Sequence, residues 1–146
     1  MLYDKITELC HTLGTQVPEP NEHGAYIFPF EGGLELTCSQ HKGGIMLSAP
    51  VAPVPEDEQV SEDLCRKLLH TSLGIIQKSP DVLSLDAKSA QFVLYRRFIE
   101  DTHQVVRFAD AVEEFLNTLE LVREKARQKR TAASVPPMYG GASYRF

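Results

Sequence analysis

The sequence predicts a single α+β domain in which helices pack against an antiparallel five-stranded sheet. The first observation behind this is apolar residues that recur at helical spacing in three separate segments. The second is five short segments of alternating or β-branched and aromatic residues between those helices. The third is the Gly-containing turns that join the first three of these segments. The predicted order is helix, three strands, helix, two strands, helix.

The first half of the chain begins with a short helix and continues as a three-stranded meander. Leu2, Ile6, Leu9, Cys10 and Leu13 recur at helical spacing, and Gly14 follows as a stop signal. Strands are expected at residues 25–30, 34–39 and 45–49, with turns at Glu31-Gly32-Gly33 and at His41-Lys42-Gly43-Gly44.

A second helix and a hairpin follow an acidic, proline-containing linker at residues 50–60. Ser61 is the expected N-cap of this helix, and Gly74 is its expected end. Residues 82–86 and 92–95 then form two strands around a short turn, so the sheet gains its fourth and fifth strands.

The last helix is predicted from a capping pair, Asp101 and Gln104, to a frayed end within residues 123–130. Its apolar stripe includes Val112, Phe115 and Leu116. Residues 131–146 carry paired prolines and paired glycines, which predicts a flexible tail. One domain over residues 1–130 is therefore expected.

Composition excludes several classes of protein. The net charge of −5 argues against non-specific nucleic-acid binding, which needs a basic surface. No apolar stretch is long enough to span a bilayer, and the first residues do not resemble a secretory signal. Three cysteines, an odd number, favour free thiols in a reducing cytoplasm.

Candidate catalytic and metal-binding residues are sparse. Cys38 and His41 have the spacing of half a zinc site or of a thiol enzyme, but no second pair of ligands accompanies them. The paired glycines lack the residues of a phosphate-binding loop. The carboxylates cluster where a linker, a helix start and a wet helix face are expected. We therefore predict no catalytic residues, no metal and no cofactor.

The positive signal is an excess of apolar residues on both faces of the predicted sheet. Ile27 and Met46 lie opposite the residues that are expected to form the core, and residues 92–99 carry large apolar side chains on both sides. A sheet with helices on one side has a polar second face when nothing covers it. Three kinds of cover remain open: the last helix, a second copy of the chain, or a bound polypeptide.

In this order and pattern the chain resembles the class I chaperones of bacterial type III secretion, the Tir-chaperone-like group. The likeness is carried by the leading helix, by residues 64–73, and by Leu83-Ser84-Leu85-Asp86 followed by Ser89-Ala90-Gln91-Phe92-Val93-Leu94. It covers roughly Met1 to Lys125. Two departures are Gly74-Ile75-Ile76, where the family usually has an Asn-rich stretch, and the Pro-Pro and Tyr-Gly-Gly tail.

The resemblance implies a cytoplasmic homodimer without enzymatic activity, whose partner is the N-terminal segment of a secreted effector. It assigns Leu68, Leu69 and Leu73 to the dimer interface, and Ile27, Phe28, Leu36 and Met46 to effector binding. The implied role is to keep that segment soluble and competent for export. An adaptor or regulatory protein of the same fold that binds a folded partner is the alternative.

Overall fold

The computed structural model describes residues 2–100 and 107–128, and its elements follow the predicted order. The elements are α1 (Leu2–Leu13), β1 (Tyr26–Pro29), the short 3-10 helix η1 (Glu31–Gly33), β2 (Glu35–His41), β3 (Gly44–Pro53), α2 (Glu58–Lys78), β4 (Val82–Asp86), β5 (Gln91–Phe98) and α3 (Phe108–Arg127). The predicted capping pair Asp101–Gln104 and the predicted tail at 131–146 lie outside the described residues.

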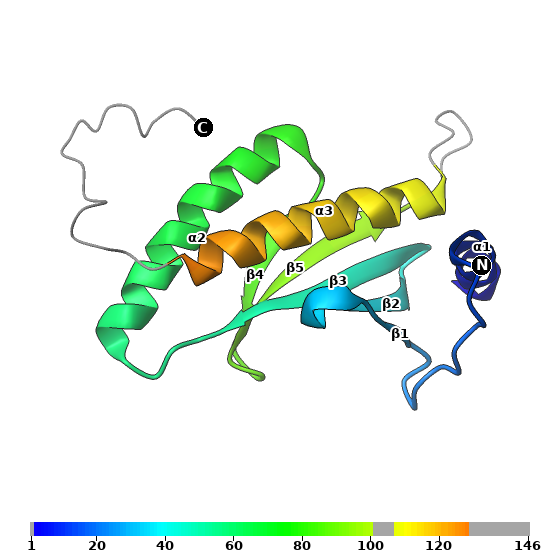
Figure 1. Cartoon of the computed structure of the whole chain (residues 1–146), viewed down its shortest axis with the longest axis horizontal. Helices are drawn as coiled ribbons and strands as arrows, with labels where there is room; N and C mark the ends of the chain where they lie inside the picture. Colours follow the sequence, from blue (N-terminus) through cyan, green and yellow to red (C-terminus); the bar gives the residue numbers. More distant parts are fainter. Residues whose placement is uncertain (1, 101–106, 129–146) are drawn as a thin grey trace.

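The five strands form one sheet in the order β1-β2-β3-β5-β4, and every neighbouring pair is antiparallel. This confirms the predicted antiparallel five-stranded sheet. β5 lies between β3 and β4, so the second helix forms the crossover from one half of the sheet to the other (Figure 1). β1 and β4 are therefore the two edge strands, at opposite sides of the sheet.

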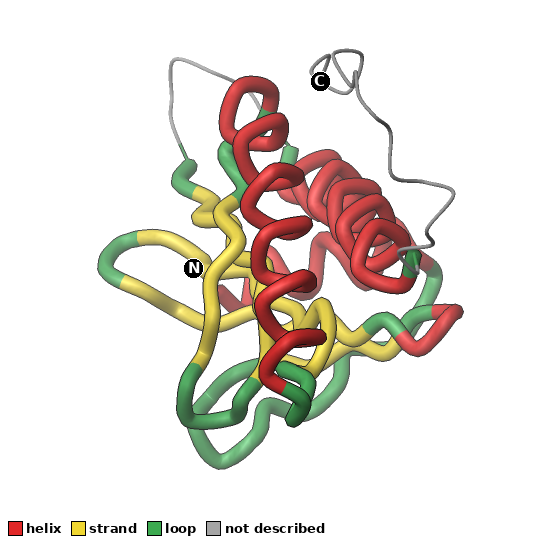
Figure 2. Tube along the Cα trace, turned by 90° about the vertical axis from the view of Figure 1, so that its left-hand side faces the viewer, coloured by secondary structure: helices red, strands yellow, loops and turns green. Residues whose placement is uncertain are grey.

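The core lies between one face of the sheet and the helices. α3 runs along β3 and β5, and its residues Phe108, Phe115 and Leu119 are fully buried (Figure 1). The rings of Phe108 and Phe98 meet edge to face, with centroids 5.1 Å apart. α2 packs beside α3, as both views show (Figures 1 and 2), while α1 packs near the other end of α3. This face of the sheet is called the inner face below, and the opposite face the outer face.

Two element boundaries differ from the prediction around the proline-containing linker. β3 extends to Pro53, with a register shift between Pro50 and Ala52 that places Val51 in the core. α2 begins at Glu58, because the carboxylate of Asp57 accepts a hydrogen bond from the Val60 N–H at 3.0 Å. Asp57 is thus the N-cap, and Ser61, the predicted cap, lies one turn inside the helix.

The second helix also ends later than predicted. It continues through Gly74 to Lys78, since Ile75 reaches the core and repays the low helix propensity of glycine. Ser79 then caps the helix, and its N–H donates to the carbonyl of Ile75 at 2.8 Å.

Candidate partner-binding surfaces

The outer face of the sheet is built from alternate residues of the strands. Cross-strand pairing aligns Ile27 with Thr37, Thr37 with Ser48, and Ser48 with Tyr95. Met46 pairs with Ser39 and Arg97 in the next such row. Directly paired residues share a face, so Ile27 and Met46 lie on the same outer face, separated by the width of β2. The apolar side chains of Ile27 and Met46 thus lie among hydroxyl side chains and the charged Arg97.

Ile27 and Met46 are available to a partner, as their position on the outer face requires. Ile27 is 39% exposed, and Met46 is half-buried. Phe28 and Leu36 are not available, because both point to the inner face, where Leu36 is completely buried. Their assignment to effector binding is therefore corrected: in this fold they are core residues beneath the helices.

A second surface runs along α2. Leu69 and Leu73 are 67% and 59% exposed, and Ile76 continues the same stripe one turn further on. Leu68 is 2% exposed and packs in the core, so its assignment to direct contact with a second copy is corrected. Residues next to each other in a helix point about 100° apart, and this separates Leu68 from Leu69.

The stripe on α2 is continuous with the edge strand β4. Leu69 and Leu85 line one groove of about 210 Å³, whose floor includes Leu68 and Phe92. Leu85 is half-exposed on this groove. Ile76 and Leu85 were not among the predicted interface residues. A signal for Ile76 is present in the sequence, because Leu69, Leu73 and Ile76 keep helical spacing across Gly74, the predicted end of the helix.

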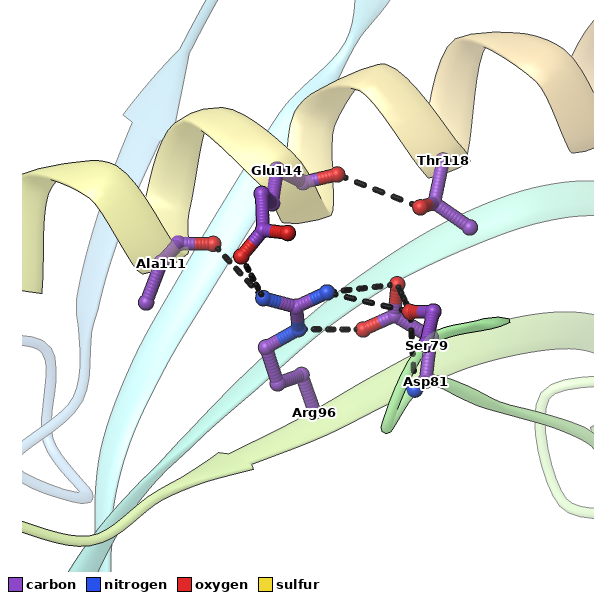
Figure 3. A network of polar contacts seen from close by, with 6 residues as sticks. All are labelled: Ser79, Asp81, Arg96, Ala111, Glu114 and Thr118. Carbon is purple, nitrogen blue, oxygen red and sulfur yellow. Dashed lines mark hydrogen bonds and ion pairs between the residues drawn. The ribbon is translucent and has the colours of Figure 1, made fainter. Parts of the chain in front are cut away.

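A buried polar cluster lies next to this surface, where α2 ends and β4 begins (Figure 3). Arg96 of β5 forms a two-pronged ion pair with Asp81, at 2.5 and 3.0 Å, and both side chains are buried. Burial lowers the pKa of the Arg96 guanidinium, but the hydrogen bonds and charges of Asp81 and Glu114 together raise it more, so the net shift is upward. The sequence signal was the inward position of Arg96 between Leu94 and Phe98.

Cys38 and His41 do not form a chemical site. Cys38 is completely buried on the inner face, whereas His41 is exposed at the end of β2. Burial, and to a smaller extent the charge of nearby Cys10, raises the pKa of the Cys38 thiol to about 12, which keeps it protonated and unreactive. The hypothesis of a thiol enzyme on this pair is therefore wrong.

Two further searches were restricted to the described part of the chain. Over residues 2–100 and 107–128, no three or more His, Cys, Asp or Glu side chains gather as a metal site would require. None of the helices in these ranges combines the length and apolar character that a membrane crossing demands. The features that remain are thus two partly apolar surfaces and one buried polar cluster.

Comparison with known proteins gives one family and a set of similar folds. The family model described as the Tir chaperone protein (CesT) family matches residues 5–123. No curated protein matches the sequence significantly.

Three solved structures illustrate the shared fold. The HopA1-SchA chaperone-effector complex contains a chain of 18% identity with a TM-score of 0.65, covering 86% of this chain and 93% of that chain. The ExoU-SpcU heterodimeric complex from the type III secretion system of Pseudomonas aeruginosa gives 18% identity and a TM-score of 0.61, with coverage of 83% and 93%. The ExsC-ExsE complex gives 17% identity and a TM-score of 0.59, with coverage of 83% and 86%.

Proposed function

The chain belongs to the Tir chaperone protein (CesT) family, and from this premise we propose that it binds the N-terminal segment of a type III secreted effector. In this function it acts in the bacterial cytoplasm and keeps the segment soluble and ready for export. Structures of similar fold that are described as chaperone-effector complexes support the proposal. The work is binding, so no catalytic group is required. The observation that carries it is the accessible outer face of β1–β3, beside the edge strand β1.

An extended segment suits that surface for a physical reason. An edge strand has main-chain N–H and C=O groups without a strand partner on one side, and an added strand satisfies them. Alternate side chains of the segment then lie over the outer face, where Ile27 and Met46 offer apolar contacts between small residues such as Thr37 and Ser39. Main-chain hydrogen bonds would contribute affinity for segments of many different sequences. The apolar contacts would favour segments with apolar side chains at the matching positions.

The effector proposal is tested with single charges on the outer face. Ile27→Asp and Met46→Asp should each weaken capture of an N-terminal effector fragment by about tenfold or more, because a carboxylate is costly to desolvate against apolar atoms. Leu121→Asp is the matched control, since Leu121 is a half-exposed leucine on α3, away from the outer face. Circular dichroism checks that each variant keeps its helix content.

Three outcomes separate the possibilities. Weak binding by the outer-face variants alone supports the proposal. Unchanged binding by both variants places the effector elsewhere and contradicts it. Binding of a folded domain, with no binding of the extended fragment, would favour the adaptor function instead.

We further propose that the chain acts as a homodimer through α2 and β4. Leu69, Leu73 and Ile76 expose apolar side chains in one stripe, and the stripe adjoins the edge strand β4. In a dimer with a twofold axis, the same patch on each copy packs against its equivalent on the other copy. The exposed leucines of both copies would then be buried in one interface. A second copy therefore fits this surface better than a partner with a different chemistry.

The dimer proposal is tested by sedimentation. Leu73→Asp should yield a folded monomer at micromolar concentration, because two like charges would face one another in the apolar interface. Leu121→Asp again serves as the control and should remain dimeric. A dimeric Leu73→Asp variant, or a monomeric unmutated protein, would contradict this interface.

A further inference from the structure

The buried polar cluster connects elements that are distant in the sequence (Figure 3). Arg96 Nη2 donates to the Ser79 hydroxyl at 3.1 Å, and Arg96 Nη1 donates to the Ala111 carbonyl at 3.3 Å and to Glu114 Oε2 at 3.2 Å. The Ser79 hydroxyl in turn donates to Asp81 Oδ2 at 2.6 Å. One guanidinium thus contacts the end of α2, the start of β4 and the face of α3 from its place on β5.

This cluster fixes the corner between α2 and β4. Ser79 is the C-cap of α2, and Asp81 directly precedes β4, so the connection between helix and strand is very short. Ile76 lies just before this corner and Val82 just after it. Any shift of the corner therefore moves the exposed apolar side chains of α2 relative to those of β4.

A buried ion pair is in general a weak source of stability. Removing two charges from water costs free energy that their attraction only about offsets. Well-packed apolar residues in the same place often give equal or greater stability. What the pair adds is a fixed relative orientation of the elements that it joins. A guanidinium donates in a fixed planar geometry, so the two-pronged contact with Asp81 and the bond to Ser79 define distance and angle together.

We propose that Arg96 and Asp81 are positioning residues for dimerisation: they hold α2 and β4 at the corner so that Leu69, Leu73 and Leu85 form one surface for a second copy. The inference rests on the dimer part of the proposed function. The pair itself lies beneath the surface and makes no contact with the second copy. A preformed surface binds more tightly because less conformational freedom is lost on association.

Two variants test the positioning role by different means. Arg96→Met combined with Asp81→Leu replaces the pair by apolar side chains of similar size. Ser79→Ala leaves the pair in place and removes its connection to α2. We expect the dimer dissociation constant, measured by sedimentation equilibrium, to rise by about tenfold for the double variant and severalfold for Ser79→Ala. Glu113→Gln, an exposed carboxylate of α3 that makes no contact with the cluster, is the control and should keep the parent value.

A stability readout separates positioning from simple stabilisation. In a Leu73→Asp background, which makes the chain monomeric under the proposed function, the double substitution should leave the urea midpoint nearly unchanged, because apolar residues replace the whole ion pair. Ser79→Ala should lower the midpoint slightly in that background, because it removes hydrogen bonds to Arg96 and Asp81. The proposal would be overturned if both variants kept the parent dissociation constant. It would also be overturned if the urea midpoint of the double variant fell in proportion to the weakening of its dimer. If the double variant does not fold, Ser79→Ala decides alone. Persistence of the dimer in Leu73→Asp itself would instead show that the proposed interface is wrong.

Discussion

At the scale of the residue, alternation determines which side chains a partner can reach. Ile27 and Phe28 are neighbours in a strand, so one of them must face the helices when the other faces outward. The same argument separates Leu68 from Leu69 on α2, where neighbours differ by about 100°. These splits could be predicted from spacing alone. Which member of each pair is buried depends on strand pairing and helix packing between distant segments.

Cysteine reactivity follows from burial. Cys10 and Cys38 are buried, whereas Cys65 is half-buried on α2. We expect iodoacetamide at mildly alkaline pH to modify the folded, monomeric Leu73→Asp variant at Cys65 only, with Cys10 and Cys38 reacting after denaturation. Mass spectrometry of the labelled peptides measures this. In a Cys65→Ser variant the folded protein should take up no label, and rapid native labelling of Cys38 would contradict the burial of β2.

The raised pKa of Cys38 predicts a loss of stability at alkaline pH. Burial raises the pKa of the Cys38 thiol from its ordinary value of 9.0 to about 12 in the folded protein, so the unfolded chain releases this proton at lower pH. Stability from this group is therefore complete below pH 9 and decreases as pH rises from there toward 12. Unfolding free energy measured by urea across this range should fall less steeply in Cys38→Ala than in the parent. Equal slopes in the two proteins would contradict the assignment.

At the scale of the element, the sequence predicts the type and order of the helices and strands better than their ends. Apolar periodicity is spread over many residues and survives local exceptions, which is why every predicted element lying in the described residues is present. Ends depend on single residues. Pro50 and Pro53 suggested a linker, yet β3 continues through them by a shift in register with β5. That pairing is non-local and is not encoded in the segment itself.

The start of α2 gives a matched test of a helix end. Asp57→Ala should lower the free energy of unfolding by about 1 kcal/mol, because the Val60 N–H loses its acceptor. Ser61→Ala removes the side chain that the sequence suggested as the cap, and it should change stability by only a few tenths of that amount. Urea unfolding at a fixed protein concentration compares the two, since dimerisation makes stability depend on concentration. A larger loss in Ser61→Ala would place the helix start one turn later.

At the scale of the whole molecule, the two proposed surfaces belong to different parts of the sheet. The outer face beside β1 lies toward one edge, and the stripe on α2 adjoins β4 at the other edge. Effector binding and dimerisation can therefore be impaired separately, and a dimer would present two effector surfaces. The sequence predicted that a second apolar face exists. It could not show that β5 inserts between β3 and β4, and this strand order is what separates the surfaces.

The central claim is that an extended effector segment binds along β1 and the outer face of the sheet. Hydrogen–deuterium exchange of the protein, with and without a captured N-terminal effector fragment, tests it most directly. We predict slower exchange in residues 26–29 on binding, with no change over residues 117–124 of α3, and a fragment whose amides are protected only in the complex. Protection confined to α2 or α3, or a fragment already protected when free, would contradict the claim.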